Sequence, residues 1–162
     1  MFLEPQSILA RLQSASFERA NSAIRNGYPE GKRMFAEELE QFVWKVAYLT
    51  IATVRKNGKP HAAMSSFVVH EGSAWIPTES GTLRLRNLAS TPFASLVVAE
   101  GSDEDHRIIL TEGGTSVVSS SEVPSDVAEA WRTKYSSDGA PAWADAWIEV
   151  RLAKLFSYRA RD

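Results

Sequence analysis

The sequence feature that most constrains the fold is a change of hydrophobic period near Trp44. Before this residue, apolar side chains recur every three to five positions over residues 5–26 and 35–43, which predicts amphipathic helices. After it, short segments rich in β-branched residues alternate with turns that contain glycine, proline or asparagine, a pattern typical of antiparallel strands. The chain is therefore expected to place N-terminal helices ahead of a sheet.

Turn dipeptides divide the middle of the chain into strands. Asn57-Gly58 tolerates the positive φ angles of a tight hairpin turn, so residues 48–55 are expected to pair antiparallel with a second strand over residues 61–69. Glu71-Gly72 predicts another tight turn, and a third strand follows over residues 73–78. These three strands are expected to form a meander.

The segments after residue 80 extend the sheet. A short helix over residues 83–90 is expected to stop before Pro92, and a fourth strand follows over residues 93–99. Residues 107–119 are read as one bent strand or two, because Gly113-Gly114 permits a bulge. The remaining elements are a helix over residues 124–135 and a last strand over residues 147–158.

Six or seven antiparallel strands with few helices predict a mainly β fold, a small antiparallel barrel flanked by helices. A chain of 162 residues has the length of one ordinary domain. We therefore expect a single domain over residues 1–162. Its N-terminal helices, over about residues 5–45, would pack on or extend from a barrel over about residues 47–160.

Composition excludes several classes of function. The formal net charge is −2 and the arginines are scattered, so no nucleic-acid partner is expected. The chain has no cysteine, and the acidic residues 103–105 have no adjacent histidine pair, so no metal site is predicted. No stretch approaches the ~18 apolar residues of a membrane span, and residues 1–19 lack a secretory pattern. We expect a cytoplasmic protein with no membrane partner.

Two arginines, Arg84 and Arg86, stand at the start of the predicted helix over residues 83–90. This is the wrong end for basic side chains, because a helix N-terminus is already positive. A phosphate bound there would meet the free N–H groups, the cation of Arg84 and the hydroxyls of Ser80 and Thr82. With or without such a ligand, one of these two hydroxyls is expected to cap the helix.

The sequence shows no catalytic arrangement of side chains. It has no Gly-x-Ser-x-Gly elbow, no Gly-rich phosphate loop of the nucleotide triphosphatase type and no carboxylate pair with diagnostic spacing. Such a pattern suits an enzyme whose cofactor carries the electrons while the protein positions and tunes it. Catalytic residues therefore stay unassigned, and the roles of His61 and His70 stay open.

A series of segments occurs in an order and spacing that carries a family resemblance: residues 48–54, 57–61, 67–69, 72–76, Thr78, 84–88, 91–92 and 94–98. In these segments the chain resembles the pyridoxamine 5′-phosphate oxidase-like split-barrel family of flavin and deazaflavin proteins. The resemblance implies a six- to seven-stranded antiparallel split β-barrel that binds FMN. It also implies a homodimer with the cofactor at the interface, and an oxidoreductase that transfers a hydride or electron pair between flavin and a small planar substrate.

The same resemblance implies which residues hold the cofactor. The family places the basic residue of a Ser-x-Lys pattern on the cofactor phosphate, and Thr82-Leu83-Arg84 matches this pattern with arginine in place of lysine. By position, Thr78 would lie beside the ribityl chain or phosphate, with Ser80 in the same turn and Arg86 as a second nearby cation. The ring would be lined from the second strand by Ala63, Met64, Ser65 and Ser66.

One departure from the family pattern concerns the substrate. Pyridoxamine phosphate oxidases carry Arg-x-Val-Leu-Leu-Lys on the second strand, where residues 61–66 here read His-Ala-Ala-Met-Ser-Ser and lack both cations. A vitamin B6 substrate is therefore not implied. Two alternatives to an FMN enzyme stay open: a reductase dependent on the deazaflavin coenzyme F-420, and a non-catalytic flavin- or haem-binding protein. Haem would need His61 or His70 as an axial ligand.

Overall fold

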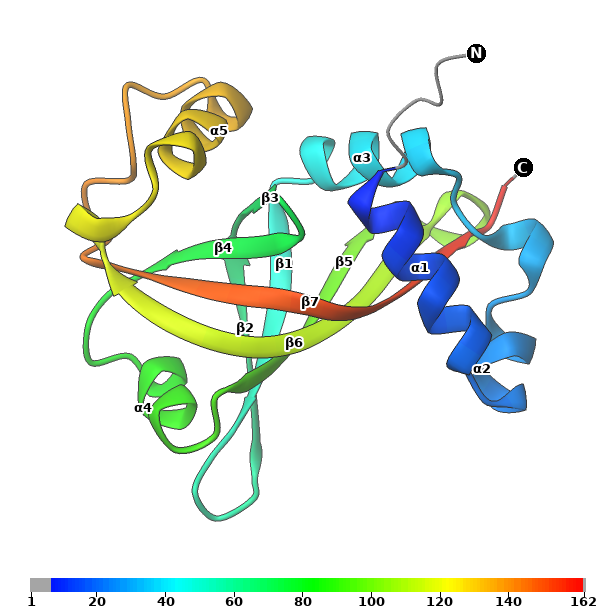
Figure 1. Cartoon of the computed structure of the whole chain (residues 1–162), viewed down its shortest axis with the longest axis horizontal. Coiled ribbons are helices and arrows are strands. Elements are labelled where there is room, and N and C mark those ends of the chain that lie inside the picture. The colour runs from blue at the N-terminus through cyan, green and yellow to red at the C-terminus, as the bar shows by residue number, and fades with distance from the viewer. Residues whose placement is uncertain (1–6, 162) are drawn as a thin grey trace.

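The strands predicted after Trp44 form one antiparallel sheet in the computed structural model, which describes residues 7–161 (Figure 1). Over these residues the sheet has seven strands in the order β2-β1-β5-β6-β7-β4-β3. The strands are β1 (Tyr48–Val54), β2 (Pro60–Ser66), β3 (Val68–His70), β4 (Ser73–Thr78), β5 (Phe93–Glu100), β6 (Arg107–Ser119) and β7 (Ala146–Arg159). The helices are α1 (Ile8–Arg19), α2 (Ser22–Gly27), α3 (Ala36–Lys45), α4 (Leu83–Ser90) and α5 (Ser125–Tyr135).

The sheet curls into a barrel that does not close. Strands β2 and β3 stand at its two edges, although they are neighbours in the sequence. The predicted mainly β, split-barrel fold is confirmed, and the two N-terminal segments with helical spacing form α1, α2 and α3. Most predicted strand bounds agree with the structure to within one or two residues.

The prediction of a single strand over residues 61–69 is wrong, because the ladder breaks at Phe67. The side chain of Phe67 is fully buried, and its main chain bonds to Tyr135 of α5 instead of to a strand. The Phe67 N–H donates to the Tyr135 hydroxyl at 3.0 Å, and that hydroxyl lies 2.8 Å from the carbonyl oxygens of both Phe67 and Ala47. Burial raises the pKa of Tyr135 to about 12, so the hydroxyl keeps its proton.

The contribution of the Tyr135 hydroxyl to stability at the Phe67 break can be tested by mutation. Tyr135→Phe keeps the ring but leaves a buried N–H without its acceptor, which costs about 1–2 kcal/mol of unfolding free energy. Urea denaturation of the two proteins measures the difference. Thr133→Ala is a suitable control, because its exposed hydroxyl bonds only within α5, to the carbonyl of Glu129. Equal stability of Tyr135→Phe and the parent would show that the hydroxyl does not support the break.

Residues 107–119 form one continuous strand, β6, with a shift of register opposite β7. Glu112 pairs with Lys154 and Gly113 pairs with Leu152, so Ala153 is the extra residue. A Cβ atom on Gly113 would lie 1.7 Å from the carbonyl oxygen of Arg151. Glycine at 113 is therefore required by the close approach of the two backbones.

Two apolar clusters lie on opposite faces of the sheet. The barrel interior holds the larger one, to which α1 and α3 contribute Leu9, Leu39 and Phe42. The smaller one lies between α5 and the outer face of β3, β4 and β7, and consists of Val68, Trp75, Val127, Trp131 and Trp147. Helix α5 therefore shields the outer face near the β3 edge (Figure 1).

Helix α1 is fixed to β7 by polar side chains. Gln13 donates to the Met34 carbonyl at 2.9 Å, and the Ser157 hydroxyl accepts from the Met34 N–H at 2.9 Å. The Leu155 N–H, just after the bulge residue, donates to the Ser16 hydroxyl at 3.0 Å. These bonds satisfy buried polar groups and set the position of α1 on the barrel.

Candidate functional site

The connection from β4 leads into the first turn of α4. The N–H groups of this turn have no side-chain cap within residues 7–161. Gly81 makes the bend with φ +81°, and Thr82 occupies the N-cap position. Within residues 7–161 the Thr82 side chain forms no capping hydrogen bond, so the predicted hydroxyl cap is wrong. The first main-chain bond of the helix runs from the Arg86 N–H to the Thr82 carbonyl at 3.2 Å. The N–H groups before Arg86 have no acceptor in the helix.

Arg84 brings a partly buried cation to this helix end. Its Nη1 atom is buried and forms no hydrogen bond to any part of the chain within residues 7–161. Burial lowers the pKa of Arg84 below its ordinary value. The first turn of α4 contains no acidic residue that could pair with the guanidinium. A buried guanidinium nitrogen without an acceptor is costly, which makes Nη1 of Arg84 a candidate donor to an anion.

Thr78 and Thr82 place two hydroxyls at the same point. Thr78 is the last residue of β4, is fully buried and pairs with Ala146 of β7. The two Oγ1 atoms lie 3.4 Å apart, which is long for a hydroxyl–hydroxyl bond. Both hydroxyls can therefore turn to another acceptor.

Ser80 is directed toward a different group. Its N–H donates to Asp145 Oδ1 at 2.6 Å, and hydrogen bonds from Ser80 lower the pKa of Asp145. Asp145 directly precedes β7, so the contact joins the turn before α4 to the start of the last strand. The structure thus brings Ser80 to a carboxylate.

Arg86 also lies apart from Arg84. It is exposed and lines a hollow of about 400 Å³ between α4 and the β1–β2 hairpin, together with Arg55, Lys56 and Asn57. Three cationic side chains thus border one surface hollow. Arg84 and Arg86 are two positions apart in the sequence, but Arg86 borders this hollow and Arg84 does not.

The four candidate ring-lining residues of β2 divide between two faces. Ala63 and Ser65 pair with Ile51 and Leu49, which are buried, so they face the barrel interior. Met64 and Ser66 face outward, and Met64 is 70% exposed. β2 is an edge strand, so its outer backbone N–H and C=O groups are free of a ladder. A flat ring beside β2 could meet this edge and one of the two pairs.

His61 is a residue whose role the sequence leaves open. It pairs with Thr53 on the interior face of the barrel, and its Nδ1 atom is buried without a partner in the described chain. Thr53 in turn accepts from Asn87 of α4 at 2.9 Å. Asn87 lies one turn after Arg84, so β1 links His61 to the same helix. In the sequence, His61 aligns with the first arginine of the family pattern, and this alignment is the feature that could have singled it out.

The geometry provides donors for an oxyanion. A guanidinium nitrogen, the free N–H groups of a helix start and two hydroxyls are found at the junction of β4 and α4. This combination is typical of phosphate recognition. It supplies no nucleophile and no general base.

The seven-stranded split barrel defines the fold class of the protein, and sequence comparison gives its family. Residues 35–157 match the family model described as pyridoxamine 5′-phosphate oxidase. Because this match spans well over half of the chain, the protein belongs to that family. No curated protein matches the chain. Within residues 7–161 no helix is long and apolar enough to cross a membrane.

Solved structures share the fold at low sequence identity. A conserved hypothetical protein from Mycobacterium tuberculosis is 20% identical, with a TM-score of 0.68 over 82% of this chain and 89% of that one. The heme storage protein HutZ from Vibrio cholerae is 19% identical, with a TM-score of 0.61 over 75% and 93%. A pyridoxamine 5′-phosphate oxidase-related, FMN binding protein from Nostoc punctiforme is 14% identical, with a TM-score of 0.51 over 70% and 74%.

Proposed function

We propose that this protein binds FMN and is an oxidoreductase that acts on a small planar substrate. The observation that carries the proposal is the buried, unpartnered Nη1 atom of Arg84 at an uncapped helix N-terminus. The residues present fit a phosphate group, because all of these groups are donors. The family match and the FMN binding relative from Nostoc punctiforme support the choice of flavin.

Each part of the site would have its own role. Arg84 and the first N–H groups of α4 would hold the phosphate, with the hydroxyls of Thr82 and Thr78 as further donors. Ser80 would join them only by leaving Asp145, so its role in the structure is to fix the turn. The free edge of β2 would orient the ring, with Ala63 and Ser65 or Met64 and Ser66 beside it. When bound, the flavin supplies transfer of a hydride or electron pair.

The proposal includes a homodimer. The outer face of β1, β2 and β5 carries exposed apolar side chains: Tyr48, Val54, Met64, Phe93 and Val97. A groove of about 740 Å³ adjoins this face between α1, α2 and the outer side of β5, β6 and β7, and it includes Val97 in its lining. Helix α5 shields a different part of the sheet. A second copy of the chain on the apolar face would bury it and enclose a flavin beside β2.

One observation favours a second candidate, the deazaflavin coenzyme F-420. Its longer, anionic tail would extend from the phosphate site and needs cations beyond Arg84. The hollow bordered by Arg55, Lys56 and Arg86 offers three such side chains next to α4.

Cofactor titration distinguishes these functions. Purified protein stripped of small molecules is titrated with FMN, coenzyme F-420 and haem, and binding is followed by fluorescence or absorbance. We expect saturable FMN binding that Arg86→Ala leaves within about twofold, because Arg86 lies apart from the phosphate donors. Selective F-420 binding that Arg86→Ala weakens would establish the second candidate. Binding of haem alone would indicate a haem-binding protein, and failure to bind all three would refute the cofactor-binding proposal.

A further inference from the structure

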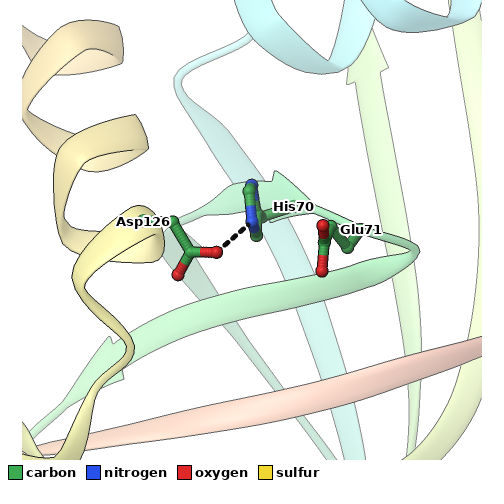
Figure 2. A group of neighbouring side chains, drawn as sticks. All are labelled: His70, Glu71 and Asp126. Carbon is green, nitrogen blue, oxygen red and sulfur yellow. Dashed lines mark hydrogen bonds and ion pairs between the residues drawn. The ribbon is translucent and has the colours of Figure 1, made fainter.

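A histidine and two carboxylates converge near the start of β4, at the opposite end of this strand from Thr78 and α4. His70 ends β3, Glu71 follows it in the turn to β4, and Asp126 lies in the first turn of α5 (Figure 2). His70 Nε2 lies 2.8 Å from Asp126 Oδ2. One ligand atom from each residue can be chosen so that all three lie within 4.8 Å of one another. Fifty-six positions of sequence separate His70 from Asp126.

Rigid structure holds these side chains in place. Glu71 and Gly72 have φ angles of +46° and +79°, which form a tight turn and keep His70 and Glu71 at its corner. Asp126 is fixed from the other side, because its neighbour Val127 is 1% exposed in the cluster under α5. Val68 of β3 belongs to the same cluster. The cluster therefore sets the distance between α5 and the turn.

The donor set is that of a transition-metal site. One imidazole nitrogen and two carboxylate oxygens suit zinc, cobalt, nickel or manganese, whereas magnesium and calcium favour oxygen alone. Ligand atoms at about 2.1 Å from a metal ion lie roughly 3 Å from one another. The His70–Asp126 separation already has this size. Glu71 is exposed, so its side chain can close the remaining distance.

The charge around the cluster also favours a dication. Within residues 7–161, the ion pair of Asp126 is with His70, and no lysine or arginine is paired with Asp126 or Glu71. With a neutral imidazole, the three side chains carry two negative charges. All three remain accessible to solvent, which gives an ion a route to the cluster.

We propose that His70, Glu71 and Asp126 bind a divalent transition-metal ion, with water completing the coordination. The ion takes the place of the proton between His70 and Asp126. It joins α5 to the β3–β4 turn, at a site independent of the proposed flavin. Sequence reading missed it because the third ligand is distant in the chain.

Zinc titration of the chelator-treated protein tests the site. We expect one saturable Zn²⁺ site per chain by calorimetry and a rise in melting temperature when Zn²⁺ is added. Co²⁺ is expected to give ligand-field absorption at the same stoichiometry. Mg²⁺ at equal concentration is expected to leave the melting temperature unchanged.

Two variants locate the ion. Glu71→Gln removes one ligand from an exposed turn and is expected to weaken Zn²⁺ binding by roughly tenfold or more, and His70→Asn is expected to abolish saturable binding. His106→Ala is the matched control: His106 also adjoins acidic residues, 103–105, but is outside the cluster. If His70→Asn fails to fold, Glu71→Gln still decides. Absence of saturable binding to the parent, or binding that Glu71→Gln leaves unchanged, would overturn the proposal.

Discussion

Replacing Arg84 with alanine is expected to weaken FMN binding by roughly 10- to 150-fold, which corresponds to about 1.5–3 kcal/mol for a charge-assisted hydrogen bond. The physical reason is the state of the Nη1 atom, which is buried and without a partner in the described chain. A bound phosphate would accept a hydrogen bond from this atom. Fluorescence titration of parent and variant with FMN measures the change.

The same variant has a second expected effect, on the protein without cofactor. Since Nη1 gains nothing from the chain, its removal should not lower the unfolding free energy by more than about 1 kcal/mol, the part due to packing of the aliphatic stem. Arg84→Lys keeps the charge but loses the planar fork, so it should bind FMN with intermediate affinity.

Arg132→Ala serves as the control for a lost arginine. Arg132 is exposed on α5 and pairs with Glu129 on the same helix, so its loss should leave FMN affinity unchanged. If Arg84→Ala binds FMN as tightly as the parent, Arg84 does not contact the cofactor. If it loses affinity only together with several kcal/mol of stability, the arginine is structural.

Local patterns predicted most of the fold because the forces that set them are local. The helix over residues 83–90 was predicted with the bounds that the structure has, since it lies between Gly81 and Pro92. The Glu71-Gly72 turn was predicted because glycine adopts a positive φ without steric cost, as Gly72 does here. Alternation along β7 predicts that Ile148 and Val150 lie on the interior face, but it does not predict that Trp147 on the outer face is buried under α5.

Features that depend on distant residues were not predicted. The break at Phe67 depends on the Tyr135 hydroxyl, 68 positions later, and nothing near Phe67 in the sequence records it. Ser80 was expected to face a phosphate or cap a helix, but its main-chain N–H and its side chain both bond to Asp145, 65 positions away. A hydroxyl in a turn can serve any acceptor, so its residue type does not identify the acceptor.

The candidate site was therefore predicted in part. A basic residue at a helix start is a local electrostatic anomaly, and the sequence suffices to single out Arg84. Arg86 carries the same charge, but it points in a different direction around the helix axis. The side chain of Arg84 is therefore partly buried, whereas that of Arg86 is exposed. His61 needed the register with Thr53 before its interior position could be recognised. Residue type identified the candidates, and tertiary packing separated them.

The stability of the protein is expected to rise with pH between about 7 and 10, because of Lys134 of α5. Burial lowers the pKa of Lys134 from its ordinary value of 10.5 to about 7. Its Nζ atom donates to the Val43 carbonyl at 2.9 Å and lies 3.6 Å from the ring centre of Phe67. Val43 is in the last turn of α3, where carbonyls lack helical partners. The side chain thus joins two helices through a partly buried amine.

The sign follows from proton binding in the two states. Between the folded pKa of about 7 and the unfolded value of 10.5, the unfolded chain holds a proton on Lys134 that the folded chain has released. The unfolding free energy therefore increases with pH across this window. Below pH 7 both states are protonated, and the full penalty of burying the ammonium applies. At 1.36 kcal/mol for each pKa unit, the penalty is at most about 5 kcal/mol, and the carbonyl and the ring face reduce it.

Lys134→Met isolates this contribution. Methionine keeps the buried stem but cannot be charged, so its unfolding free energy should vary less over pH 6–10 in urea denaturation. The variant should be more stable than the parent near pH 6, where the parent buries an ammonium. It should be less stable near pH 10, where the parent keeps the bond to Val43 at no charge penalty. Lys45→Met is the control, because Lys45 is exposed and pairs with Glu100, and it should keep the slope of the parent. Parallel profiles for the parent and Lys134→Met would mean that the surrounding carbonyl and ring hold the ammonium at its ordinary pKa, and α5 would then be joined to α3 by a permanent charge.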